Sequence, residues 1–369
     1  MRIIFTGGGT GGHIYPIMAL IERLKERNIA TNDEILFVGT KKGLEAKIVP
    51  AAGVNFQTIE IQGFSRKHLL SNFATVNLFM KATKKAKKII TDFKPDVVVG
   101  TGGYVSGAIV FAAAKLHVPT MIHESNSVVG VANKFLGHYV DKICYTFDDA
   151  AKQFREKKKL VKTGNPRSQQ VLGLAASKVD LQSKWGLNPK TPTVLVFGGS
   201  RGALAINRIM LKSLTKLEKK PYQIIWVTGT YYYDEIQKKL AGIDYGKTIK
   251  ILPYVKDMPA LLPKMTCVVS RSGATSIAEF TALGVPAILI PSPNVTHNHQ
   301  MINALDLEKK GAATVIAEND LNPNNFISSI DHILLDSKYA DEMSKASKKL
   351  GVPNASDQVL QVMQEIANN

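Results

Sequence analysis

A histidine that directly follows a glycine-rich turn is the first residue of this chain whose setting suggests chemistry. In the segment FTGGGTGGHIYP the G-x-G-x-x-G spacing is met by Gly7, Gly9 and Gly12, and His13 comes next. N–H groups at the start of a helix favour an anion such as phosphate, and an imidazole exchanges a proton near neutral pH. The segment therefore predicts a phosphate-binding turn with an acid–base residue beside it, although a histidine that only packs the turn stays open.

The elements around this turn are those of a dinucleotide-binding fold, but one residue of such a site is missing. RIIF predicts a buried strand before the turn, and IYPIMALIERLKER predicts an amphipathic helix after it. A dinucleotide site also needs an acid at the tip of the second strand, roughly 20 residues on, to bind the ribose hydroxyls. Here EILFVGT ends in Gly39 and Thr40, so an NAD-dependent dehydrogenase is disfavoured.

The order strand, turn, helix recurs along the chain and predicts an α/β protein. It appears again in KPDVVVGTGGYVSGAIVFAAAK, VPTMIHESNSVVGVANKFLG, PTVLVFGGSRGALAINRIM and TCVVSRSGATSIAEFTALGVPAILIP. We expect two Rossmann-like, doubly wound parallel-sheet domains that face a cleft, with ligands at the carboxyl ends of the strands. Gly164 and Pro166 mark a linker, which gives domains of residues 1–163 and 164–353. A last helix, about 354–369, is expected to pack back on the first domain.

Composition and charge limit the partners. The 369 residues carry 47 Lys and Arg against 30 Asp and Glu, a net charge of +17, which implies an anionic partner. Aromatic residues make up only 7% of the chain and are not interleaved with basic ones, which disfavours nucleic acid. The adjacent acids Asp148 and Asp149 are predicted as a helix N-cap pair rather than as metal ligands.

The segment HLLSNFATVNLFMKATKKAKKII, residues 68–90, predicts a helix with two apolar stripes. One stripe consists of Leu69, Phe73, Val76 and Met80, and the other of Phe79, Ala82, Ala86 and Ile89. The lysines that follow them are Lys81, Lys84, Lys85, Lys87 and Lys88. Apolar side chains beside lysines suit an anionic membrane surface, while a core-packed helix with a solvated lysine end is the alternative. Leu70 is adjacent to the first stripe and is placed with the membrane residues.

Taken in order, GGTGGH, GGYVSG, HESN, GNPRS, GGSRGA and SRSGATSIAE followed by THNHQMINA resemble the MurG family of peptidoglycan N-acetylglucosaminyltransferases, glycosyltransferase family 28. The resemblance implies the two-domain GT-B fold. It also implies inverting transfer of N-acetylglucosamine from UDP-N-acetylglucosamine to the 4-hydroxyl of the muramic acid sugar in undecaprenyl-diphosphate-MurNAc-pentapeptide. The implied place of action is the cytoplasmic face of the bacterial cell membrane, with no cofactor and no bound metal, and with cell-wall synthesis proteins as possible partners.

The resemblance also assigns roles to individual residues. His13 is the leading base for the acceptor hydroxyl, and Glu124 is the rival, since a carboxylate can do the same work. The donor would be bound by Thr10, Gly11, Gly12, Asn126, Arg167, Ser200, Val255, Ala274, Thr275, Ser276, Ile277, Ala278, Glu279 and Gln300. The acceptor diphosphate would lie at Gly102, Gly103, Tyr104 and Ser106. The residues HESN could instead only order their own loop.

The sequence departs from the family at two positions, and two other enzymes remain as alternative functions. Arg201 and His299 stand where some relatives carry glutamine, which leaves contact details open. A diacylglycerol glucosyltransferase or a UDP-N-acetylglucosamine 2-epimerase would share the donor half of this fold and differ in the reaction at the other half. Assays for transfer, hydrolysis or epimerised sugar would separate them.

Overall fold

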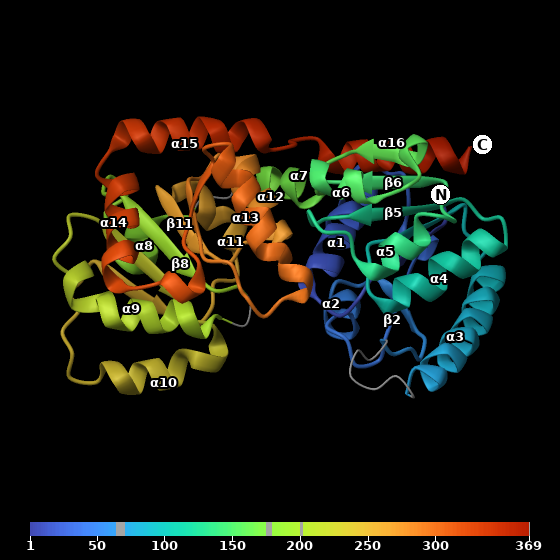
Figure 1. Ribbon diagram of the computed structural model, residues 1–369, viewed down its shortest axis with the longest axis horizontal. Coiled ribbons are helices and arrows are strands. Elements are labelled where there is room, and N and C mark those ends of the chain that lie inside the picture. Colours follow the sequence, from blue (N-terminus) through green and yellow to red (C-terminus); the bar gives the residue numbers. More distant parts are fainter. Residues whose placement is uncertain (64–70, 175–178, 200–201, 369) are drawn as a thin grey trace. The chain divides into compact units, whose positions relative to one another are not determined.

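The protein was analysed as a computed structural model, which describes residues 1–63, 71–174, 179–199 and 202–368, with residues 71–74 described by their backbone only. Contacts divide the chain into two compact units. The first unit comprises residues 1–170 and 354–369, and the second comprises residues 171–353 (Figure 1).

The first unit is built on a seven-stranded parallel sheet with the strand order β3-β2-β1-β4-β5-β6-β7. Its strands are β1 (Ile3–Thr6), β2 (Ile35–Gly39), β3 (Asn55–Thr58), β4 (Val97–Gly100), β5 (Thr120–Glu124), β6 (Lys142–Tyr145) and β7 (Leu160–Lys162). Its helices are α1 (Gly11–Glu26), α2 (Glu45–Ala51), α3 (Ser71–Phe93), α4 (Tyr104–Lys115), α5 (Val131–Leu136), α6 (Asp148–Gln153) and α16 (Ala355–Ala367). The strand order changes direction between β1 and β4, which is where such sheets bind ligands.

Helices cover both faces of this sheet. Ile4 of β1 packs in a core cluster with α3 and α4, whereas its neighbours Ile3 and Phe5 pack with α1 and α16 on the other face (Figure 1). This alternation explains why Ile3, Ile4 and Phe5 are all apolar, because both faces of the strand are buried. The helical spacing of Ile14, Ile17 and the apolar residues after them gives α1 the stripe that it buries.

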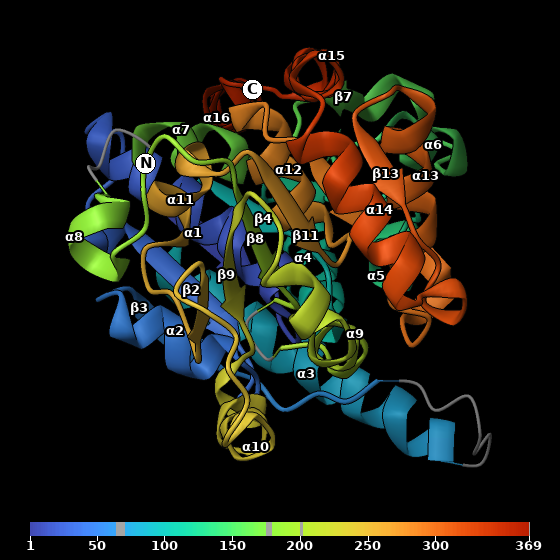
Figure 2. The same ribbon diagram turned by 90° about the vertical axis from the view of Figure 1, so that its left-hand side faces the viewer.

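The second unit repeats the design with a six-stranded parallel sheet in the order β10-β9-β8-β11-β12-β13. Its strands are β8 (Thr193–Phe197), β9 (Gln223–Val227), β10 (Ile249–Leu252), β11 (Cys267–Ser270), β12 (Ala287–Leu289) and β13 (Ala313–Val315). Its helices are α8 (Leu181–Trp185), α9 (Leu204–Leu217), α10 (Thr230–Leu240), α11 (Met258–Leu261), α12 (Ala274–Leu283), α13 (His299–Lys309), α14 (Pro323–Leu334) and α15 (Ser337–Leu350). Helices α9 and α14 pack side by side on one face of the sheet (Figure 2). Two parallel sheets of this kind confirm the predicted α/β class; that they border one cleft stays a prediction.

The division between the units falls inside α7 (Arg167–Leu174) rather than at residue 163, where the sequence placed it. The first turn of α7 is hydrogen-bonded to the first unit, because Gln169 donates to Asp357 at 2.8 Å and Gln170 donates to Glu22. The prediction of Asp148 and Asp149 as N-caps was wrong: Phe147 is the N-cap of α6, and the two acids lie in its first turn, paired with Lys162 and Lys152.

Candidate active site

The turns that follow β1 and β4 meet at the point where the sheet changes direction. The Gly8 N–H donates to the Gly102 carbonyl at 3.3 Å, and the Thr101 hydroxyl donates to the His13 carbonyl at 2.6 Å. A side chain at Gly103 would approach the Gly8 carbonyl to 2.7 Å, and its φ of +84° is one that other residues rarely adopt. The structure therefore joins two motifs that are 90 residues apart into one site, and it adds Thr101, whose role no pattern in the sequence indicated.

His13 is held in one tautomer. Its Nδ1 lies 2.8 Å from the Gly8 carbonyl oxygen. Because a carbonyl only accepts, Nδ1 carries the hydrogen in the neutral ring and Nε2 keeps a lone pair. A Cβ atom placed on Gly102 would lie 2.9 Å from Nε2, so this nitrogen faces the bare backbone of the second turn. The ring is thus presented as a base toward the turn of the GGYVSG motif.

Two backbone N–H groups of the glycine turn are used within the protein. The Gly8 N–H is used by Gly102, and the Gly9 N–H donates to the carboxylate of Glu45 at 3.2 Å. These two groups are committed within the protein, so neither is free for a phosphate. The next N–H groups along the chain belong to the exposed Thr10 and to Gly11 and Gly12 at the start of α1.

Glu124 is occupied by its own loop. It is buried at the end of β5, and its carboxylate accepts from the N–H groups of Asn126 and Gly130, both at 3.0 Å, and from the side-chain amide of Asn133 at 2.9 Å. These donors come from the loop and helix that follow the strand. The arrangement favours the loop-ordering interpretation of HESN and places Asn126 beside Glu124.

His123, next to Glu124, is a structural histidine. Its Nε2–H donates to the Gly164 carbonyl at 2.8 Å, and the Ser125 hydroxyl lies 3.3 Å from Nδ1. Burial lowers the pKa of His123 to about 4, against an ordinary value of 6.5, although the bond to Gly164 acts in the opposite direction. The ring is therefore neutral at physiological pH and anchors the segment that leads to α7.

This gives a pH prediction. The unfolded chain binds a proton at His123 below about pH 6.5, whereas the folded chain does so only at about pH 4. The contribution of the neutral ring to the free energy of unfolding is therefore complete above pH 6.5 and is lost as the pH falls toward 4. The loss amounts to about 3 kcal/mol. We expect the free energy of unfolding, measured with urea across this interval, to fall less steeply in His123→Gln, which keeps a donor for Gly164. Equal slopes would contradict the prediction.

Arg167 lies beside the start of α1. Its guanidinium carbon is 5.8 Å from the centre of the Tyr15 ring, and that ring lies close against Gly11. The same guanidinium donates to Gln170 at 2.5 Å. The structure thus brings Arg167 toward the glycine turn, within the first unit, although the two are far apart in the sequence.

The acceptor residues predicted in GGYVSG form the entrance to α4, which begins at Tyr104 after Gly103. Tyr104 is exposed, and its ring lies against Gly63. Ser106 is fully buried against Gly100, and its hydroxyl has no hydrogen-bond partner in the part of the chain that the structure describes.

In the second unit, the predicted donor residues lie at the carboxyl edge of the sheet. The turn before α12 is joined to α13, because the Ser272 hydroxyl donates to the Gln300 carbonyl at 2.7 Å, while the Gln300 side chain accepts from the Ser292 N–H at 2.9 Å. The first two turns of α12 contain the predicted residues Ala274, Thr275, Ser276, Ile277, Ala278 and Glu279. Val255 is buried in the loop after β10, and Ser200 lies outside the described residues.

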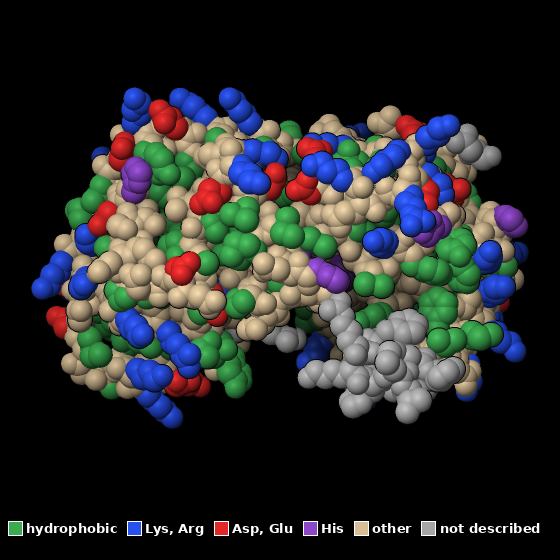
Figure 3. Space-filling model, in the orientation of Figure 1, with side chains coloured by type: hydrophobic (Ala, Val, Ile, Leu, Met, Phe, Trp, Pro, Cys, Tyr) green, Lys and Arg blue, Asp and Glu red, His purple; other side chains and the backbone are tan. Residues whose placement is uncertain are grey.

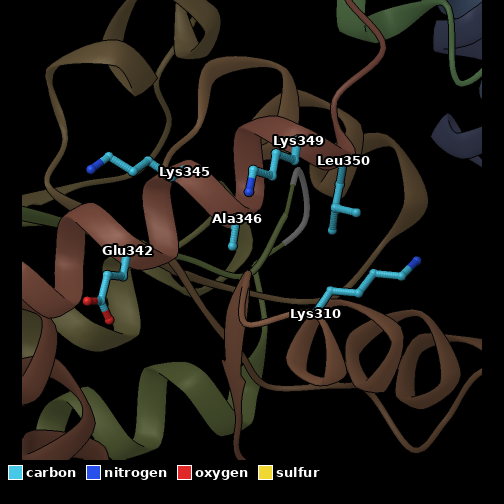
Figure 4. A pocket seen from close by; sticks show the side chains of 6 residues that line it. All are labelled: Lys310, Glu342, Lys345, Ala346, Lys349 and Leu350. Carbon is cyan, nitrogen blue, oxygen red and sulfur yellow. The ribbon is translucent and has the colours of Figure 1, made fainter.

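A separate cavity of about 390 Å³ in the second unit is lined by Lys310, Glu342, Lys345, Ala346, Lys349 and Leu350 (Figure 4). Lys310 comes just before β13, so the cavity lies toward the amino ends of the strands of the second sheet, away from the turn that precedes α12. The ammonium groups of Lys310 and Lys345 point away from each other in Figure 4. We assign this cavity no role.

Comparison with known proteins defines the class. Residues 3–145 match the glycosyltransferase family 28 N-terminal domain, and residues 193–359 match the C-terminal domain of the same family. The chain belongs to glycosyltransferase family 28.

Among its relatives is a protein of Lactobacillus acidophilus that is 80% identical over the full length of both chains and is named UDP-N-acetylglucosamine--N-acetylmuramyl-(pentapeptide) pyrophosphoryl-undecaprenol N-acetylglucosamine transferase. A protein of Lacticaseibacillus casei with the same name is 53% identical over 98% of each chain. The crystal structure of Acinetobacter baumannii MurG shares the fold, with a TM-score of 0.77 at 24% identity, over 99% of this chain and 100% of that one. The structure of S. aureus MnaA with UDP also shares it, with a TM-score of 0.72 at 18% identity, over 100% of this chain and 97% of that one.

Proposed function

We propose that this glycosyltransferase moves N-acetylglucosamine from UDP-N-acetylglucosamine to the 4-hydroxyl of the muramic acid sugar in undecaprenyl-diphosphate-MurNAc-pentapeptide, with inversion at the anomeric carbon. The 80% identity, over its full length, to a transferase named for this donor and acceptor carries the proposal. The geometry agrees with it, because inverting transfer needs a base on the acceptor hydroxyl, and Nε2 of His13 is presented as one.

His13 is the proposed base, in preference to Glu124. The lone pair on Nε2 faces the Gly102 turn, whereas the carboxylate of Glu124 is engaged by three donors of its own loop. The acceptor diphosphate is proposed at Gly102, Gly103, Tyr104 and Ser106, where the start of α4 favours an anion and a buried hydroxyl is available.

The donor is proposed to bind mainly within residues 164–353. Glu279 would accept from the ribose hydroxyls, the Val255 backbone would bind the uracil edge, and Arg167 would reach the diphosphate. The remaining donor residues are proposed to be Thr10, Gly11, Gly12, Asn126, Ser200, Ala274, Thr275, Ser276, Ile277, Ala278 and Gln300. The tie between Ser272 and Gln300 supports this grouping, since it holds α13 against the start of α12.

The test of this function is product analysis. The purified protein is incubated with radiolabelled UDP-N-acetylglucosamine and a short-chain analogue of the lipid acceptor, and the products are separated chromatographically. We expect labelled disaccharide on the acceptor. Epimerised or free labelled sugar in its place would overturn the proposal in favour of a 2-epimerase or a hydrolase, and glucose transfer to diacylglycerol would favour a glucosyltransferase.

We further propose that α3 contacts an anionic membrane surface, which would place the protein at the cytoplasmic face of the cell membrane, where cell-wall synthesis proteins could bind it. No helix among the described residues is long and apolar enough to cross a bilayer. Of the two stripes, Ala82, Ala86 and Ile89 are buried in the core, whereas Val76 and Met80 are 47% and 67% exposed. The core-packed alternative therefore accounts for one stripe only. Leu69 and Leu70 lie outside the described residues, as does the side chain of Phe73.

The surface around this stripe supports the same proposal. The five lysines Lys81, Lys84, Lys85, Lys87 and Lys88 are exposed along α3. Phe79 packs against Phe111 and Phe135, and the exposed Phe135 and Tyr139 extend the apolar area beyond α3. Figure 3 shows apolar side chains gathered over α4 and α5 near the right-hand edge, with basic side chains around them.

A charge placed in this surface should weaken membrane binding. We expect Met80→Glu to lower binding to vesicles of anionic lipid about 10-fold in a sedimentation assay, because it removes apolar contact and repels the headgroups. Leu335→Glu, at a leucine that is 54% exposed in the second unit, is the matched control and should bind like wild type. Binding should also weaken with added salt. Equal binding by the two variants would show that this surface does not contact the membrane.

A further inference from the structure

One peptide group separates a buried carboxylate from the proposed base. The peptide that joins Gly8 to Gly9 donates its N–H to Oε2 of Glu45 at 3.2 Å. Its carbonyl, on Gly8, accepts the hydrogen on Nδ1 of His13 at 2.8 Å. Glu45, this peptide group and the imidazole therefore form one hydrogen-bonded chain that ends at Nε2.

The position of Glu45 requires a carboxylate. The side chain is fully buried at the start of α2, and its other oxygen, Oε1, accepts from the N–H of Thr40 at 3.1 Å and from its hydroxyl at 2.7 Å. Donors thus meet both oxygens, so a glutamine amide would set one N–H group against another. A Cβ atom on Gly8 would lie 2.6 Å from the carboxylate, and one on Gly43 would lie 2.2 Å from it. Both glycines make room for this group.

We propose that Glu45 is a positioning residue for His13, acting through the Gly8–Gly9 peptide. This inference rests on the proposed role of His13 as the base. A negative charge on the N–H side of a peptide polarises it and makes its carbonyl a stronger acceptor. The stronger acceptor holds the hydrogen on Nδ1 and stabilises the positive charge that the ring gains when Nε2 takes the proton of the acceptor hydroxyl. Glu45 touches neither substrate nor the reacting atoms.

The sequence contained a weak signal for this role. The end of β2 lacks the acid that binds ribose in a dinucleotide site. The side chain of Glu45, which comes from α2, nevertheless lies at this end and accepts hydrogen bonds from Thr40. There it accepts from the protein backbone, within the first unit.

The primary test measures the tautomer of His13. The measurement is long-range ¹H–¹⁵N NMR of the full-length protein labelled with ¹⁵N-histidine, in mildly alkaline buffer. His13→Ala identifies the signals. We expect wild type to carry the hydrogen on Nδ1 and Glu45→Gln to shift a substantial population to the Nε2–H form. Thr40→Val loses one carboxylate contact but keeps the link to Gly9, so it should lose stability without shifting the tautomer. An unchanged tautomer in folded Glu45→Gln would overturn the proposal.

Kinetics provide the second readout. We expect Glu45→Gln to lower kcat by about 10- to 100-fold, as is typical when the partner that orients a metal-binding histidine is removed, with the KM for the donor little changed. In the His13→Ala background the same substitution should have little further effect. Glu365→Gln, at an exposed glutamate of α16, is the matched control and should keep wild-type kcat.

Two further outcomes are distinguishable. If Glu45→Gln does not fold, Glu45→Asp replaces it as the test, since it keeps the charge on a shorter side chain. We expect Glu45→Asp to shift the tautomer of His13 partly. A wild-type tautomer in a Glu45→Asp protein that has lost activity would contradict the proposal. If His13→Ala transfers sugar at the wild-type rate, the assignment of the base fails, while the tautomer of Glu45→Gln still decides whether the carboxylate acts on the ring.

Discussion

Replacement of His13 by alanine is expected to lower the rate of sugar transfer by about 10²- to 10⁴-fold, the usual contribution of a general base. The reason is that Nε2 is the atom presented toward the Gly102 turn, with its lone pair fixed by the bond from Nδ1 to Gly8. The effect should fall on kcat, because the donor is proposed to bind mainly in the second unit. Steady-state transfer kinetics, together with calorimetric titration of UDP-N-acetylglucosamine, measure the two quantities separately.

The control for this variant is His332→Ala. His332 is exposed on α14 and stacks on Tyr339, so its loss should leave transfer at the wild-type rate. An unchanged kcat in His13→Ala would remove His13 from the reaction. A loss confined to donor affinity would instead make the residue a binding group.

Replacement of Glu124 by alanine is expected to lower the free energy of unfolding by about 1–3 kcal/mol, the cost of a buried donor that loses its acceptor. The buried amide of Asn133 loses its bond to the carboxylate, whereas water can reach the N–H of the exposed Gly130. Urea unfolding followed by circular dichroism measures the change, and His13→Ala, which is half-buried, should show a smaller one.

Glu124→Gln separates stability from chemistry. The amide keeps one acceptor oxygen and removes the charge, so it should recover part of the lost stability and retain measurable transfer. If this variant folds with wild-type stability and transfers no sugar, Glu124 is the base and our interpretation of its hydrogen bonds as loop-ordering is wrong.

Much of the fold was predictable, since it is coded by local patterns. The runs IIF and VVV are apolar at every position because both faces of a parallel strand are buried, and these runs lie in β1 and β4. Gly351 disfavours a helix and Pro353 breaks one, so α15 ends at Leu350. The two predicted glycine turns of the first unit also lie at the carboxyl edge of its sheet, because each follows directly after a parallel strand.

The contacts of the site residues were not predictable in the same way. The motif HESN made Glu124 a candidate base, yet whether its carboxylate faces a substrate or its own loop depends on where Gly130 and Asn133 come to lie. The two stripes of α3 looked alike in sequence, and only packing against α4 decided that Ala82 and Ala86 are buried while Met80 is exposed.

The sequence by itself determined the alternation of strands and helices, the glycine turns and the type of residue placed at each turn, because these depend on backbone preference and on spacing within a few residues. Only the tertiary structure decided that His13 faces Gly102, that the Gly9 N–H belongs to Glu45 and that His13 holds its hydrogen on Nδ1. The first two rest on contacts between segments that are separate in the chain and meet only when the sheet brings their ends to one edge. The bond from Nδ1 to Gly8 spans five residues within one turn, and the hydrogen bond from Gly8 to Gly102 holds that turn in place.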